Sequence, residues 1–116
     1  MSMKTIARMF LVLLLSLPLM AHHGSAAYNN AERVVLKGII KECSFSNPHI
    51  VFKLETTDAT WEISLAAPGP LRAAGLTQES FKSGTEATVW GAAHRTKPHD
   101  MYASGITIGD ITFGNK

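Results

Sequence analysis

The sequence predicts an all-β fold: a small five-stranded OB-like barrel with a short helix between strands 3 and 4, preceded by a signal peptide. Five segments after residue 33 alternate apolar and polar residues, as half-buried strands do. A break rich in proline and glycine separates the third segment from the fourth. The first segment is long and changes its apolar face midway, which suits a strand shared by both sides of a barrel. An open sandwich with the same five strands is the alternative.

The first 21 residues have the order of a secretory signal peptide. Lys4 and Arg8 precede an apolar run over 9–15, and Ala21 is a small residue at a suitable cleavage position. The run is shorter than the roughly 20 residues of a transmembrane helix. We therefore expect residues 1–21 to be removed, and the protein to be periplasmic or secreted without a membrane attachment.

Cleavage after Ala21 would make His22 the first residue of the mature chain, directly followed by His23. A cut after Ala26 or Ala27 is an alternative that would remove both histidines, and an uncleaved anchor is another.

Composition limits the partners of the mature chain. The full sequence has 11 basic and 9 acidic residues, and loss of Lys4 and Arg8 leaves nine of each. A balanced charge argues against binding to nucleic acid, which requires clustered Lys and Arg. A lone cysteine, Cys43, excludes an internal disulfide and lies on an apolar strand, so we interpret it as a small hydrophobic residue.

Residues 22–33 lack periodicity and are predicted to form a flexible N-terminal arm, which Tyr28 can anchor, while residues 34–116 form the barrel domain. Leu36 and Ile40 share one face of the first strand. Beyond them the apolar positions shift by one residue, which predicts a bend or a bulge.

The remaining elements follow in order. Residues 46–49 form a proline turn, 50–55 and 61–65 form the second and third strands, and Pro70 opens a short helix over 71–74.

Gly75 ends this helix and Thr77 caps the next turn. A fourth strand with Ala87 and Val89 facing inward, a polar loop over 94–100 and a fifth strand over 102–108 complete the barrel, and a last short strand follows it.

Several motifs occur together along the chain. They are Ala21-His22-His23-Gly24, Val34 to Gly38, Asn47-Pro48-His49, Trp61-Glu62, Pro70-Leu71-Arg72, Gly75-Leu76-Thr77, Phe81-Lys82-Ser83-Gly84 and Val89-Trp90-Gly91. With this order the sequence resembles a family of small exported bacterial proteins of unknown function. The resemblance implies export and one compact β domain, and it brings no established activity.

The histidines suggest a metal site. An N-terminal His22 offers its amine and its ring Nδ1 to one ion, His23 adds a nitrogen, and His49 in a rigid turn can complete the set. Copper(II) favours tetragonal nitrogen ligation and stands highest in the affinity order, so we expect copper. In the alternative interpretation the histidine pair is a solvated tail and His49 bonds the backbone. His94 and His99 lie in a polar loop, and their role stays open.

These patterns predict an exported metal-binding protein that is not an enzyme, since no nucleophile motif or phosphate-binding loop occurs. Its partners would be a metal ion and a periplasmic protein. The alternative is a periplasmic OB-fold interaction module for a protein or an oligosaccharide, in which the histidines are incidental. Trp90 could then serve as a stacking platform, unless it is packed beneath the helix or the N-terminal arm.

Overall fold

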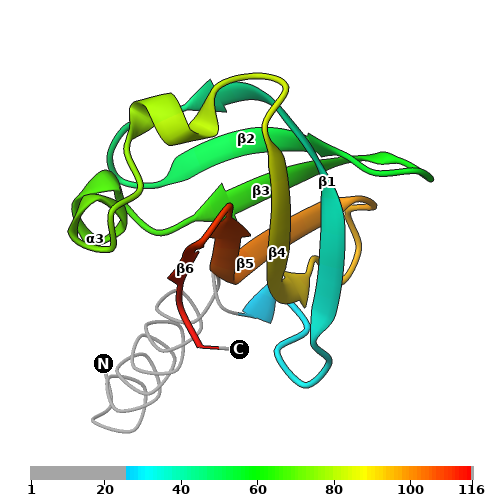
Figure 1. The fold of residues 1–116 in the computed structure, drawn as a ribbon. Helices are drawn as coiled ribbons and strands as arrows, with labels where there is room; N and C mark the ends of the chain where they lie inside the picture. Colours follow the sequence, from blue (N-terminus) through cyan, green and yellow to red (C-terminus); the bar gives the residue numbers. More distant parts are fainter. Residues whose placement is uncertain (1–25, 116) are drawn as a thin grey trace, which may run out of the picture.

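In the computed structural model, which describes residues 26–115, the first strand pairs with two different neighbours along its length (Figure 1). This strand is β1 (Val34–Ser44). Its first half runs antiparallel to β4 (Glu86–Ala93), and its second half runs antiparallel to β2 (Ile50–Glu55). Because β1 serves both sides, the sheet curves back on itself. The histidine pair and the predicted signal peptide lie outside the described residues.

The barrel closes where β3 (Thr60–Leu65) pairs in parallel with the start of β5 (Asp100–Ile108). Strand β3 also runs antiparallel to β2, and β5 runs antiparallel to β4, so the cycle is β1-β2-β3-β5-β4. A short strand, β6 (Ile111–Phe113), extends the sheet beside the end of β5. The predicted five-stranded OB-like barrel is confirmed, and the closure by β3 and β5 excludes the open sandwich.

Strand β1 bends where the sequence changes its apolar face. Its register with β2 shifts after Lys41, and Glu42 there has a φ of 48°, in the left-handed region. Such a bulge turns the next side chain, Cys43, back toward the core, against which it packs half-buried. Earlier in β1, a Cβ atom on Gly38 would overlap the carbonyl group of Glu55, so glycine lets the two strands approach closely.

The connection between β3 and β4 carries a helix and a 3-10 turn. Helix α3 (Pro68–Ala73) begins two residues before Pro70, the predicted opening residue, and ends one residue before the predicted end at Ala74, because Pro68 occupies the first helical position. Gly75 ends it as predicted, with a φ of 96°. Thr77 then caps the turn η1 (Gln78–Phe81). No helix within residues 26–115 is long and apolar enough to cross a membrane.

Apolar side chains from all five barrel strands, α3 and η1 fill the interior. The buried core comprises Ile40, Ile50, Phe52, Leu54, Ile63, Leu65, Leu71, Leu76, Phe81, Ala87, Val89, Met101, Ala103 and Ile106. In β5 the buried positions change their period between Ala103 and Ile106, opposite the point where the β4–β5 register shifts after Trp90. This second irregularity leaves Tyr102 on the outer surface.

Candidate functional site

The part of the N-terminal arm that the structure describes is bonded to the barrel at the end of β4. The amide of Arg95 donates to the carbonyl of Ala27 at 2.8 Å, and its Nε donates to the carbonyl of Ala26 at 3.0 Å. Tyr28 and His94 form an isolated β-bridge beside these bonds. The predicted role of Tyr28 as an anchor is confirmed, and the arm from Ala26 onward has a defined place on the barrel. We call this edge of the barrel, which comprises the end of β4, the start of β5 and the turn before β2, the rim.

A buried carboxylate holds this anchor. Asp100, which is 6% exposed, accepts a hydrogen bond from the Tyr28 hydroxyl to its Oδ1 at 2.9 Å. Its Oδ2 lies 3.3 Å from Lys97 Nζ. Desolvation, followed by the nearby Asp100 carboxylate, raises the pKa of Tyr28 to about 12, and a hydrogen bond to Asp100 raises the pKa of Lys97. The Tyr28 phenol therefore stays neutral and acts as a donor at physiological pH.

Three aromatic rings continue from Tyr28 across the rim. The ring of Tyr28 meets His94 at 5.1 Å between centroids and Tyr102 at 5.9 Å. Tyr102 in turn meets His49 at 5.6 Å, and all three contacts are edge-to-face. Two ring contacts thus connect the docked arm to His49. The turn before β2 and the arm are brought together by Tyr102, an outward-facing residue on β5.

His94 cannot offer a lone pair to a metal in this arrangement. Its Nδ1 lies 2.9 Å from the amide nitrogen of Lys97 and 3.2 Å from that of Thr96, and both amides donate to it. A neutral imidazole has one acceptor nitrogen, so its proton must reside on Nε2. His94 therefore closes the turn after β4, a structural role that the polar loop in the sequence did not reveal.

His49 has a different environment. It is exposed, directly after the Asn47–Pro48 bend and before β2. Its Nδ1 lies 3.4 Å from the hydroxyl oxygen of Tyr102, and no backbone amide of residues 26–115 donates to the ring. The other ring nitrogen, Nε2, thus lies on the side of the ring away from this contact.

The third described histidine, His99, lies elsewhere. Its ring packs edge-to-face on Trp61 at 5.3 Å, and its backbone has a φ of 52°. Its carbonyl accepts a hydrogen bond from the amide of Glu62 at 2.9 Å. Across residues 26–115, no three His, Cys, Asp or Glu side chains are placed to hold one metal ion. Of the predicted ligands, His49 is described, whereas His22 and His23 lie outside the described residues.

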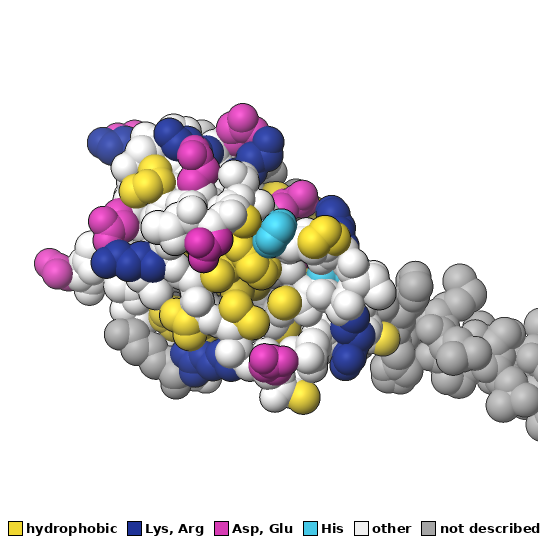
Figure 2. All heavy atoms as spheres, turned by 90° about the vertical axis from the view of Figure 1, so that its right-hand side faces the viewer, with side chains coloured by type: hydrophobic (Ala, Val, Ile, Leu, Met, Phe, Trp, Pro, Cys, Tyr) yellow, Lys and Arg dark blue, Asp and Glu magenta, His cyan; other side chains and the backbone are white. Residues whose placement is uncertain are grey.

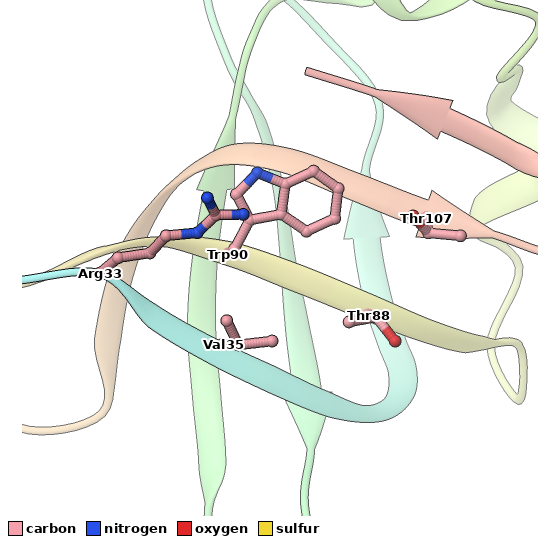
Figure 3. A pocket seen from close by; sticks show the side chains of 5 residues that line it. All are labelled: Arg33, Val35, Thr88, Trp90 and Thr107. Atoms are coloured by element: carbon pink, nitrogen blue, oxygen red, sulfur yellow. The ribbon is translucent and has the colours of Figure 1, made fainter. Parts of the chain in front are cut away.

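A second feature, a groove of about 260 Å³, lies on the outer face of β1, β4 and β5. Its lining residues are Arg33, Val35, Thr88, Trp90 and Thr107 (Figure 3). Trp90 is 2% exposed, because the Arg33 guanidinium lies 5.5 Å above its ring and Gly105 lies against it. A Cβ atom on Gly105 would overlap the indole. Trp90 is therefore packed beneath the arm, one of the two predicted arrangements, and Val35 is the exposed apolar residue of this face, at 59%.

Charges on the surface are mixed. Acidic and basic side chains are interspersed over the face seen in Figure 2, with a histidine beside a hydrophobic patch. Lysines form surface pairs with glutamates, as in Lys37–Glu86 at 2.9 Å and Lys53–Glu42 at 2.8 Å. No cluster of one sign gathers on the face in view.

Comparison with known proteins gives a family and a fold. The model of the family of unknown function DUF6152 matches residues 11–103 of the chain. No curated protein matches the sequence.

Crystal structures of TiaS are similar in fold. The ZRD-deleted mutant in complex with agmatine and the complex of TiaS with tRNA and ATP each give a TM-score of 0.51 at 18% identity, and the match covers 69% of this chain. The complex of TiaS with tRNA, AMPCPP and agmatine gives 0.52 at 18% identity over 71% of this chain. The match covers 22%, 18% and 20% of those chains, respectively. At this identity the similarity shows the barrel fold alone.

Proposed function

This chain belongs to the DUF6152 family of unknown function, and we propose that it is an exported metal-binding protein that holds copper through His22, His23 and His49. It would act in metal handling in the periplasm or outside the cell, and not as an enzyme. The observation that carries this proposal is the docking of the arm: Ala26 and Tyr28 are fixed to the barrel rim two ring contacts from His49.

The docked arm limits how far the histidine pair can lie from the rim. Three residue steps separate Ala26 from His23, and four separate it from His22. An extended chain spans at most about 3.6 Å per residue, so His23 is within about 11 Å of Ala26. An arm that left the barrel at Val34 would allow about 40 Å instead. The contacts of Tyr28 therefore favour a shared site of the pair with His49.

The ligand chemistry suits copper(II). The α-amine and ring Nδ1 of an N-terminal His22 form a chelate, and His23 and His49 supply two further nitrogens. Tetragonal nitrogen ligation is the preference of copper(II). No ligand triad lies within residues 26–115, so His49 needs partners from the preceding segment.

The proposed export and the proposed partners rest on the predicted signal peptide and on the charge balance. Cleavage after Ala21 exposes the amine of His22, and it leaves a chain with balanced charge. The interspersed charges on the face in view argue against a nucleic acid partner, and the proposed partners are a metal ion and a periplasmic protein (Figure 2).

The test compares two mature chains, one starting at His22 and one starting at Ser25. The second retains every contact described for the arm, so it is a matched control for folding. We expect copper(II) to bind the first chain with nitrogen hyperfine structure in its electron paramagnetic resonance spectrum. We expect it to bind the second chain more weakly by at least the ~10-fold that loss of an outer-shell partner alone typically costs. Equal affinity would contradict the proposal, as would mass spectrometry showing that the exported protein starts at Ala27 or later.

The groove beside Trp90 supports the alternative, an interaction module for a periplasmic protein or an oligosaccharide. Val35 is the observation that favours it, because an apolar side chain with 59% exposure lies beside the Arg33 guanidinium. Partner binding that is lost in Val35→Glu and retained in the chain starting at Ser25 would favour this alternative.

A further inference from the structure

Of the two ring nitrogens of His49, Nδ1 is the one with a hydrogen-bond partner among residues 26–115. Its Nδ1 lies 3.4 Å from the hydroxyl oxygen of Tyr102, and the two rings meet edge-to-face at 82°. A metal ion approaching Nδ1 would have to displace this hydroxyl. The Nε2 atom lies on the other side of the exposed imidazole. The route for ligation is therefore through Nε2.

Ligation through Nε2 determines where the proton of the ring must lie. A neutral imidazole that gives the Nε2 lone pair to a metal carries its proton on Nδ1. That N–H needs an acceptor, and the Tyr102 hydroxyl oxygen is at hydrogen-bond distance from it. Partners of this kind orient a ligating histidine and raise its basicity, and their loss typically costs 10- to 100-fold in metal affinity.

We propose that Tyr102 is the positioning residue for His49: its hydroxyl accepts a hydrogen bond from Nδ1–H and leaves Nε2 free for the metal. This inference rests on the proposed function. It assigns to Tyr102 a role that its strand position alone does not suggest.

The surroundings of Tyr102 make it a rigid support. Its backbone lies between β4 and β3, paired with Ala92 on one side and Ser64 on the other. The ring of Tyr28 packs against it at 5.9 Å, and the Tyr28 hydroxyl is itself fixed by Asp100. Tyr102 is 38% exposed, and its hydroxyl contact with His49 lies at the surface. The same tyrosine thus contacts both the docked arm and the predicted ligand.

The experiment uses the chain starting at His22, since every strand of the barrel lies after that residue. Tyr102→Phe retains the ring and its edge-to-face contacts and removes the hydroxyl. Thr107→Val is the matched control, because it removes a hydroxyl from the outer surface of the same strand, where that group bonds Thr112. Copper(II) affinity is measured for each variant. Ring ¹⁵N chemical shifts of His49 are recorded without metal and with zinc, a diamagnetic probe.

We expect zinc to bind Nε2 of His49 with the proton on Nδ1. In Tyr102→Phe the metal-free ring shifts toward the Nε2–H form, and copper affinity falls about 10- to 100-fold. Thr107→Val should match the unmodified chain in both measurements.

Two results would overturn the role of Tyr102 while leaving the metal site intact. One is metal ligation through Nδ1 of His49. The other is an unchanged affinity and an unchanged ¹⁵N spectrum in Tyr102→Phe, in a protein whose affinity still depends on His49. If His49→Ala does not weaken copper binding, the proposed function fails, and the inference about Tyr102 as support for a metal ligand fails with it.

Discussion

Two turns on the rim of the barrel each present a histidine ring to the edge of a tyrosine, and the surrounding backbone makes the two rings chemically different. At His94, the amides of Thr96 and Lys97 donate to Nδ1, so the lone pair is used inside the turn. At His49, the nearby group is the Tyr102 hydroxyl, and a second nitrogen remains available. The comparison teaches that the number of histidines does not define a metal site. What matters is which nitrogen the local hydrogen bonds leave free.

The largest effect on stability is expected where the arm is fixed beside the His94 turn. Asp100→Ala removes the acceptor of the Tyr28 hydroxyl and the partner of Lys97, so we expect the free energy of unfolding to fall by about 2 kcal/mol. Urea denaturation measures it. Asp58→Ala is the control, since Asp58 is exposed in the β2–β3 loop and should change stability by less than about 0.5 kcal/mol. Equal effects of the two substitutions would show that Asp100 does not stabilise the fold through Tyr28 and Lys97.

A smaller loss, about 1 kcal/mol, is expected for Tyr28→Phe, because one hydrogen bond disappears while the ring remains. The contribution of Tyr28 to stability also depends on pH. The folded-state pKa of Tyr28 is raised from 10.0 to about 12, so its stabilising contribution is complete below pH 10 and is lost as the pH rises toward 12.

Absorbance titration at alkaline pH checks this expectation. The chain has two tyrosines, and the transition near pH 12 should be absent in Tyr28→Phe. A transition that persists in this variant would show that Tyr28 is not the shielded phenol.

The comparison of the two turns is sharpened by His94→Ala and His49→Ala. Removal of His94 leaves two amides without their acceptor, and because the turn is exposed to water we expect a loss of about 1 kcal/mol. Removal of the exposed His49 should change stability by less than about 0.5 kcal/mol. Thermal unfolding measures both. A larger loss at His49 would mean that its ring has a structural role as well.

The smallest effect is expected for Cys43, which lies on β1 before the His49 turn and is the sole thiol of the chain. Burial raises its pKa to about 11, so the thiolate that binds metals or reacts is scarce at neutral pH. Cys43→Ser should leave copper affinity unchanged. A disulfide reagent should modify the thiol slowly in the folded protein and rapidly in urea. Fast modification of the folded protein would contradict the shielded position.

The barrel could be predicted from the sequence because apolar and polar residues alternate along its strands. The alternation in β2 and β4 defines their inner faces, and the shift of face near Cys43 predicts the bulge that the structure places after Lys41. The sequence does not indicate the second bulge, between β4 and β5, because the apolar residues of β4 lie on both of its faces there. Helix α3 begins earlier than predicted because either of two prolines in its first turn satisfies the same rule.

The rim could be predicted only in part. Tyr28 stands out in an arm of small and polar residues, and this contrast predicts its anchoring role. The burial of Asp100 cannot be predicted, since an aspartate in a polar loop carries no mark of burial. The role of Tyr102 is hidden for a related reason: its contact with His49 joins residues 53 positions apart, and a pairing of this kind arises from the closure of β3 onto β5. Local sequence patterns do not encode it.

The proposal that His49 and not His94 completes a copper site with the N-terminal histidines is tested directly by metal titration. Copper(II) is titrated into the chain starting at His22 and into its His49→Ala and His94→Ala variants, with electron paramagnetic resonance spectra recorded at each point. We expect His49→Ala to lose one nitrogen from the hyperfine pattern and more than ~10-fold in affinity, whereas His94→Ala retains both. Equal spectra for all three proteins, or a loss confined to His94→Ala, would contradict it.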